Sequence, residues 1–502
     1  MAAATVVAAV GSIRRQKHAC VSMHRSRLAG HVWFPGTAAV AERRGPELPR
    51  ASNTMGAVAV EVVGGFVTAC STADKWEQAI VEVVDAVGKN EYECGIAFVH
   101  ELHVTMAQGM APVLGALREK LGVRTLIGCA VSGAIGQAAG PSAMAYGGLG
   151  GDGTDWPPIE VERGYVLSIG LIREATATPF FLGSGTIGDV ELLERKAAEG
   201  SVRSILTIAD PFGPTESILK RLDESFPAAV KAGGLSVPLQ VGGAERGAFM
   251  PSMAIASAGC DVRVVDQGVC GILLEDVDVH TIVCQGCCGA GPPVKVSSVS
   301  GQVLDGIGGR PANESLRLIF SSVDAEMREK MQRFLVLGLG NAGESERSLG
   351  DGDWLIRMIS GVTPEGGLVV GDSVEVGQPM RFHVRDKATA EADLALMLKR
   401  YRLEKSFWGS TGGEPMGAFL FTCNGRGESL YGRRHVDARA AVEALGDACG
   451  TRVAGFFCNG EIGSPGLSIP GFSEEDAPQR RGTALHGFTA VFAILVPTAK
   501  SS

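Results

Sequence analysis

Polar residues gathered near the C-terminus have the side chains needed to hold a small charged ligand. Glu461 is suited to a cationic amino group, whereas Asn424 and Asn459 can orient a carboxylate or an amide. A guanidinium offers paired donors that match a carboxylate. The predicted ligand-binding residues are Asn424, Arg426, Asn459, Glu461, His486 and Arg357.

The same region offers an alternative chemistry, in which Cys458 acts as a nucleophile with His486 and Glu461 as partners. A reactive thiolate needs a positive or basic neighbour, and nothing in the sequence shows that these side chains meet. Cys458 also follows two phenylalanines in an apolar run, which favours packing inside the protein. We therefore keep an enzyme acting on a small molecule as an alternative to a binding protein.

A second cysteine motif is Cys284-Gln-Gly-Cys287-Cys288, which contains the CxxC spacing of zinc and redox sites. No second CxxC or suitably spaced Cys/His pair follows it, so the motif favours a structural turn. The sequence predicts neither a metal ion nor a cofactor.

The polar residues belong to a turn that occurs twice in the chain. Leu126–Gly136 aligns without gaps with Val453–Gly463, and three glycines and an isoleucine coincide. In the second copy, Asn459 and Glu461 replace the Ser132 and Ala134 of the first. Because polar residues are added at a shared turn, we expect the C-terminal copy to hold the ligand site, in a crevice at the carboxyl ends of the strands.

Each copy of the turn follows the same expected elements. Residues 95–99 and 417–421 read as strands, while 110–121 and 438–449 have one apolar helical face, the second helix capped by Asp437. A looser third copy runs through strands at 204–208 and 239–243. Residues 294–303 and 367–376 alternate like half-buried antiparallel strands. The sequence therefore predicts an α/β protein of two related layered lobes, with mixed sheets flanked by helices.

Composition excludes several classes of protein. The 502-residue chain has a formal net charge of -9, which argues against a general nucleic-acid binder, and no apolar run reaches the roughly 18 residues of a membrane span.

The first fifty residues differ in composition from the rest of the chain, with eight Lys or Arg against two Glu. An Arg-rich, acidic-poor segment is typical of an organelle transit peptide, so we expect residues 1–55 to direct the protein to the chloroplast or, alternatively, to the mitochondrion.

Five motifs in order resemble the C-terminal domain of the FIST family: Cys423–Gly427, Tyr431-Gly432, the helix from Asp437, Val453–Gly463 and Leu485–Phe492. The N-terminal FIST domain is matched more loosely over 95–300. The resemblance implies a sensory protein that binds small ligands such as amino acids. Some eukaryotic relatives carry an F-box that recruits a ubiquitin ligase, but residues 46–70 do not match one.

We therefore expect a FIST N-like lobe over 56–312 and a FIST C-like lobe over 313–502. The leading interpretation is a soluble sensory protein that binds an amino-acid-like ligand and acts on an unidentified signalling protein. A small-molecule enzyme and a ubiquitin-ligase adaptor remain the alternatives.

Overall fold

A computed structural model describes residues 65–138, 158–183, 188–240, 249–341, 343–346, 349–407, 413–446, 452–468 and 482–498. The expected transit peptide, residues 1–55, lies outside these ranges. In the part of the chain that is described, no helix combines the length and the apolar character needed to cross a membrane.

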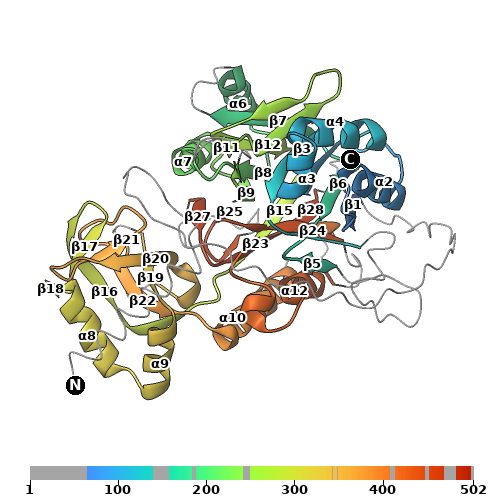
Figure 1. The fold of residues 1–502 in the computed structure, drawn as a ribbon. Helices are drawn as coiled ribbons and strands as arrows, with labels where there is room; N and C mark the ends of the chain where they lie inside the picture. The colour runs from blue at the N-terminus through green and yellow to red at the C-terminus, as the bar shows by residue number, and fades with distance from the viewer. Residues whose placement is uncertain are drawn as a thin grey trace, which may run out of the picture.

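Outside residues 288–384, the described residues form three α/β units whose main elements follow one another in the same order (Figure 1). The first unit has β1 (Phe66–Ser71), α2 (Trp76–Val87), β2 (Cys94–His100), α4 (Met110–Leu121), β3 (Thr125–Val131) and β6 (Leu167–Ile172). The second has β7 (Ala177–Gly183), α6 (Gly188–Glu199), β8 (Ser204–Ala209), α7 (Thr215–Ser225), β9 (Val230–Leu235) and β14 (Gly268–Leu274). The third has β15 (Val277–Cys284), α10 (Lys387–Phe407), β23 (Gly417–Cys423), α12 (Val436–Leu445), β24 (Val453–Cys458) and β28 (Ala490–Pro497).

Shorter elements connect these. They are α3 (Glu101–Met106), α11 (Glu428–Tyr431), β10 (Leu239–Gln240), β11 (Phe249–Met250) and β26 (Leu467–Ser468).

Each unit passes two strands to a neighbouring unit. After β3, the chain turns and places β4 (Ala134–Gly136) and β5 (Ile159–Val161) beside β24 of the third unit. After β24, β25 (Glu461–Gly463) and β27 (Ala484–His486) join the second unit beside β9. After β9, β12 (Met253–Ser257) and β13 (Arg263–Val265) join the first unit beside β3. The exchange is therefore cyclic.

The exchanged strands have the same register at all three places. Ala134 of β4 pairs with Phe456, Met253 of β12 with Cys129, and Glu461 of β25 with Gly234. One residue earlier, the carbonyl oxygens of Gly133, Ser252 and Gly460 accept hydrogen bonds from backbone N–H groups of the facing strands. The N···O distances are 3.0, 2.7 and 2.8 Å. The three units are thus related by a pseudo-threefold arrangement.

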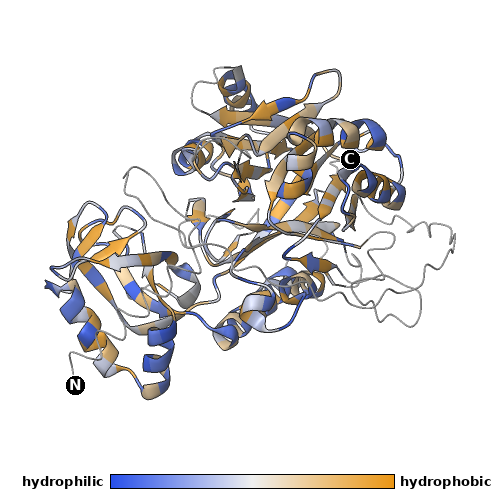
Figure 2. Ribbon diagram, in the orientation of Figure 1, coloured by the Kyte–Doolittle hydropathy of each residue, from blue (hydrophilic) through white to orange (hydrophobic). Residues whose placement is uncertain are grey.

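The three sheets enclose one hydrophobic core. Phe98, Leu206 and Phe456, one from each sheet, are buried in the same cluster, and the rings of Phe98 and Phe456 stack at 5.0 Å. The other face of each sheet packs against its own helices, α2 and α4, α6 and α7, or α10 and α12. Figure 2 shows the result, with hydrophobic strands inside and hydrophilic helix faces outside.

A closed barrel is inserted between β15 and α10 and lies at one side of the three-sheet body (Figure 1). Its strands are β16 (Cys288–Ser300), β17 (Val303–Ile307), β18 (Arg310–Pro311), β19 (Leu335–Leu339), β20 (Leu355–Val362), β21 (Leu368–Val370) and β22 (Pro379–Val384). Pairing of β16 with both β17 and β22 closes the ring around a separate core. Helices α8 (Ala312–Ser322) and α9 (Ala325–Arg333) pack beside it.

The predicted α/β class with mixed sheets is confirmed, and α4 spans the predicted residues 110–121. The predicted third copy of the strand-helix-strand pattern has its second strand in the wrong place. Its second strand is β9, and the run at 239–243 begins with the short β10 and continues beyond the described residues. The antiparallel strands expected near 294–303 and 367–376 belong to the barrel. The expected boundary at 312/313 falls within the barrel unit, after the first residue of α8.

A glycine at the same position of β3, β9 and β24 yields a prediction. A methyl group on Gly455 would overlap the carbonyl oxygen of Leu420, and one on Gly233 would overlap that of Thr207. The same group on Gly128 would meet mainly a methyl of Leu114, at 2.6 Å. Since backbone cannot move as a side chain does, Gly455→Ala and Gly233→Ala should each lower the free energy of unfolding by about 3 kcal/mol, and Gly128→Ala by about 1 kcal/mol.

Chemical denaturation of the three variants measures these differences. Equal losses at the three positions would contradict the account of the close strand contacts.

Candidate functional site

The turns that begin the strand exchange meet in a chain of polar side chains. The Ser132 hydroxyl of the first unit donates to Asn424 at 2.8 Å, and Asn424 donates to the Asn459 side-chain oxygen at 2.8 Å. Asn459 in turn donates to the carbonyl oxygen of Ser236, in the second unit, at 3.2 Å. The two predicted asparagines therefore lie together and connect all three units.

Glu461 follows this turn at the first position of β25 and is fully buried. One carboxylate oxygen, Oε2, accepts bonds from the Thr489 backbone N–H at 3.1 Å and hydroxyl at 2.7 Å. The other oxygen, Oε1, has no partner among the described residues. The equivalent positions in the other units are Ala134 and Met253, so only the third unit places an ionisable group here.

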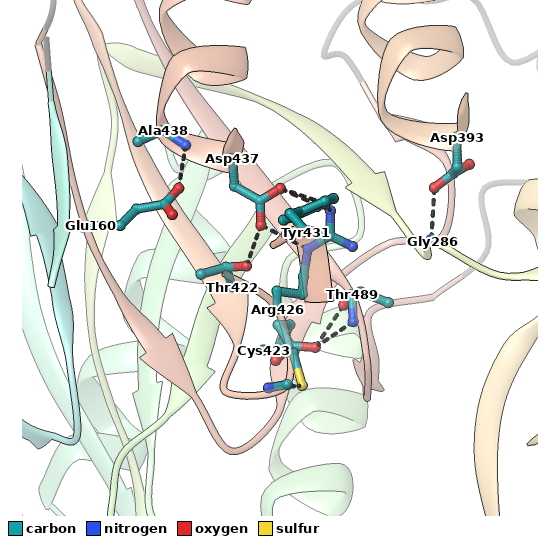
Figure 3. Close-up of polar contacts among 12 residues, drawn as sticks. Glu160, Gly286, Asp393, Thr422, Cys423, Arg426, Tyr431, Asp437, Ala438 and Thr489 are labelled. Carbon is teal, nitrogen blue, oxygen red and sulfur yellow. Dashed lines mark hydrogen bonds and ion pairs between the residues drawn. The ribbon is translucent and has the colours of Figure 1, made fainter. Parts of the chain in front are cut away.

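Arg426 is also fully buried, in the loop after β23. Its Nε and Nη2 donate to the two oxygens of Asp437, at 2.7 and 2.9 Å, and Nη2 also contacts the Tyr431 hydroxyl. Figure 3 shows Arg426 aimed at Asp437 and Tyr431, and the Thr422 hydroxyl donates to the same Asp437 oxygen as Arg426 Nε. The third nitrogen, Nη1, finds no partner within the described ranges.

The prediction that Asp437 caps the helix before the second turn is wrong. His435 is the N-cap residue of α12, whereas Asp437 lies in the first turn and is buried against Arg426. Burial alone would raise the pKa of Asp437, but the Arg426 guanidinium holds it below its usual value. The sequence showed the helix start and could not show the buried ion pair.

Arg385 is a site residue that the sequence reasoning missed. It follows β22 directly, where the chain leaves the barrel, and its side chain is buried. Its Nη2 donates to the carbonyl oxygen of Gly425 at 3.2 Å, and the guanidinium lies 5.5 Å from the centre of the Phe488 ring. Its Nε has no partner in the described part of the chain. Nothing in its local sequence marks it, because the barrel insertion brings it to the turn.

These three unpartnered groups belong to side chains that are coupled electrostatically. Both Arg385 and Arg426 are near enough to Glu461 to favour its ionised form. Burial raises the pKa of Cys287, and the positive charges of Arg385 and Arg426 oppose that rise. A buried polar group without a partner is unfavourable, and such groups in native proteins usually mark a bound water, an ion or a functional site. The turn around Glu461 is therefore the best candidate site in the part of the chain that the structure describes.

Burial controls the ionisation of Glu461. It raises the pKa of this carboxyl to about 8, although the two bonds from Thr489 and the charges of Arg426 and Arg385 act in the opposite direction. Near neutral pH the side chain is therefore mainly a neutral acid.

Of the other two predicted residues, His486 lies directly opposite Glu461 in the pairing of β25 with β27, and its Nδ1 has no partner among the described residues. His486 Nε2 lies 2.9 Å from the carbonyl oxygen of Gly463, and burial lowers the pKa of His486 to about 4. Arg357, on β20 of the barrel, is paired with Asp372 and donates to the carbonyl oxygen of Leu485 at 3.0 Å. Arg357 thus joins the barrel to β27.

The arrangement does not activate Cys458 as a nucleophile. Its thiol lies 3.5 Å from the carbonyl oxygen of Phe456 inside the shared core. Burial, followed by the nearby Glu461, raises the pKa of Cys458 well above its usual value, which is opposite to what a reactive thiol needs.

The CxxC motif lies where the chain enters the barrel. Cys284 ends β15 and Cys288 begins β16, and within the described residues neither of them nor Cys287 forms a disulfide. The described residues contain no group of His, Cys, Asp and Glu side chains arranged to hold a metal ion.

Comparison with known proteins gives a consistent result. The family model for the FIST N domain matches residues 94–310, and that for the FIST C domain matches 314–464. An uncharacterized protein of Mycobacterium tuberculosis is 31% identical over 340 residues, which cover 67% of this chain and 80% of that protein. An uncharacterized protein of Mycobacterium bovis is 30% identical over 340 residues, covering 67% of this chain and 79% of that protein.

The raised pKa of Glu461 predicts a change of stability with pH. The carboxyl has a pKa of about 8 in the folded protein against 4.5 ordinarily, so the folded state holds the extra proton between these values. Stability from this group is fully present below pH 4.5 and is lost as the pH rises to about 8. Glu461→Gln cannot ionise and should therefore lack this pH-dependent loss, which is about 5 kcal/mol.

Unfolding free energies of the wild type and Glu461→Gln, measured across this pH range, provide the check. Glu77→Gln, at an exposed position of α2, is the matched control and should follow the wild type. Parallel pH curves for wild type and Glu461→Gln would contradict the burial of a neutral acid.

Proposed function

We propose a function from one premise: this chain belongs to the FIST family. FIST domains are associated with sensory and signal-transduction proteins. Our proposal is that the chain is a sensory protein that binds a small amino-acid-like ligand at the turn around Glu461.

The observation that carries the proposal is the set of three unpartnered buried groups. Arg385 Nε and Arg426 Nη1 are donors, and Glu461 Oε1 belongs to a carboxyl group. Together they complement the carboxylate and the ammonium of an amino acid, with the two guanidinium groups on the carboxylate and Glu461 on the ammonium. Asn424 and Asn459, joined at 2.8 Å beside this turn, hold its backbone in place.

A ligand at this position would contact groups that connect the units. Thr489 binds Glu461, and the adjacent Phe488 has a left-handed backbone with φ of 68° and packs against Phe334 of the barrel unit at 5.5 Å between ring centres. Arg385 leads directly out of the barrel. Binding would therefore favour one arrangement of barrel and body over others, which is how a ligand shifts a conformational population.

A thermal-shift screen of the full chain against the common amino acids tests the proposal. A ligand that binds only the folded state stabilises it by about 2.7 kcal/mol at one hundred times its dissociation constant. We expect a specific increase in melting temperature that is lost in Arg385→Gln and in Glu461→Ala. Glu77→Gln, at an exposed position of α2, is the control and should retain binding. An amino acid that stabilises wild type and Arg385→Gln equally would place the ligand elsewhere.

The affinity for such a ligand should depend on pH. An ammonium group favours ionised Glu461, and this carboxyl has a pKa of about 8 in the free protein. Binding below pH 8 must therefore release a proton, so the association constant should rise about tenfold for each pH unit below about pH 7 and less steeply from there to about pH 8. Calorimetric titration measures this slope. In Glu461→Gln the binding should be weaker and the slope absent, and an unchanged slope in that variant would exclude Glu461 as the titrating group.

The organelle address of residues 1–55 is a separate proposal that rests on their basic composition. A fluorescent protein fused after residue 55 of this chain should accumulate in chloroplasts. Fluorescence confined to the cytosol would contradict it.

A further inference from the structure

A groove lies between α10 and α12 on the outer side of the third unit. It has a volume of about 320 Å³. Leu394 and Leu398 of α10 and Val436 and Ala440 of α12 give it an apolar floor. These four side chains belong to the core of the third unit and are each at most 8% exposed, so the groove offers a narrow apolar strip between charged residues.

Helix α10 differs from its equivalents in the other two units. It has 21 residues, whereas α2 and α6 have 12 each. Leu396 and Leu403 are 63% and 51% exposed, and they are seven residues apart, on one face of the helix. These two leucines give α10 exposed apolar surface on another face of the helix, outside the residues that line the groove.

The surroundings of the groove are basic although the chain as a whole is acidic. Arg433, Arg434 and Arg439 line it together with two glutamates, Glu391 and Glu443, and α10 carries five Lys or Arg against three Asp or Glu. The whole chain has a formal net charge of -9. Arg433 already pairs with Glu391 of α10 at 3.0 Å, and Arg434 with Glu428 at 2.8 Å, both at exposed positions. Carboxylates of another molecule can replace these weak surface pairs.

We propose that this groove is the output surface of the protein and docks a short, acidic, amphipathic helix of a partner protein. The apolar face of such a helix fits the floor formed by Leu394, Leu398 and Val436, as helical peptides with apolar residues at i, i+3, i+4 and i+7 fit grooves in general. Its acidic residues meet Arg433 and Arg439. Charge complementarity selects an acidic helix over a basic one.

Both walls of the groove connect to the candidate ligand site. The first turn of α12 binds Arg426 through Asp437. On the other side, Asp393 of α10 accepts a bond from the Gly286 backbone N–H at 2.8 Å, and a side chain at Gly286 would contact Arg426 Nη1 (Figure 3). A ligand engaging Nη1 would therefore act on both helices. This coupling, unlike the docking itself, rests on the proposed function.

Fluorescence anisotropy with the full chain and no added ligand tests the docking. The probe is a labelled synthetic helix of about 15 residues, with leucines spaced three and four apart and glutamates elsewhere. We expect saturable binding that weakens at least tenfold in the double variant Arg433→Glu, Arg439→Glu, and that weakens as salt rises from about 50 to about 300 mM. The same peptide with lysine for glutamate should bind at least tenfold more weakly to the wild type.

The corresponding helix pair of the second unit supplies the matched control. Arg195→Glu with Arg221→Glu reverses two exposed charges on α6 and α7 and should leave the affinity unchanged. Absent binding, equal binding of the basic peptide, or equal affinity in the α12 double variant would overturn the proposal.

Sedimentation over a range of concentrations distinguishes a second copy of this chain as the occupant. A dimer that dissociates in the Arg433→Glu, Arg439→Glu variant would also overturn the partner-helix assignment. Because no ligand is added, failure of these tests leaves the amino-acid site unaffected, and failure of the amino-acid screen leaves the docking unaffected.

Discussion

The structure depends on the strand exchange that follows the third strand of each unit. The backbone N–H groups of Ala130, Phe457 and Leu235 must find acceptors, and each finds one in a strand donated by another unit. These bonds close three sheets around one core, which includes Phe98, Leu206 and Phe456. A single unit would expose both its sheet edge and its inner face, so the three units stabilise one another.

The same exchange removes the turns from water, which is why a polar side chain there has consequences. Ala134 and Met253 can occupy the buried position after the turn without any unsatisfied group. Glu461 occupies the equivalent position with one oxygen unpartnered among the described residues and a pKa raised to about 8. Arg385 and Arg426 bring further unpartnered donors to this one turn. Local rules of folding are commonly broken at functional sites, and here they are broken in only one of three equivalent places.

Much of this could be predicted from the repeated turn, because Leu126–Gly136 and Val453–Gly463 occupy equivalent strands and turns. The strand β9 was missed because Gly233 and Gly234 interrupt its apolar pattern. Closure of the barrel depends on pairing between distant strands, which periodicity does not reveal. Arg385 could not be predicted as a site residue for the same reason, since it follows the barrel strands and is far from Glu461 along the chain. The pairing of Arg426 with Asp437 required the packed structure.

The central claim is that a ligand joins Arg385, Arg426 and Glu461. The most direct test is a high-resolution crystal structure of the full chain grown with a pooled set of the common amino acids. The account predicts density for a carboxylate within hydrogen-bond distance of Arg385 Nε and Arg426 Nη1, with the amino group at Glu461 Oε1. A structure in which these three atoms bind only water, or pair with other protein groups, would contradict it.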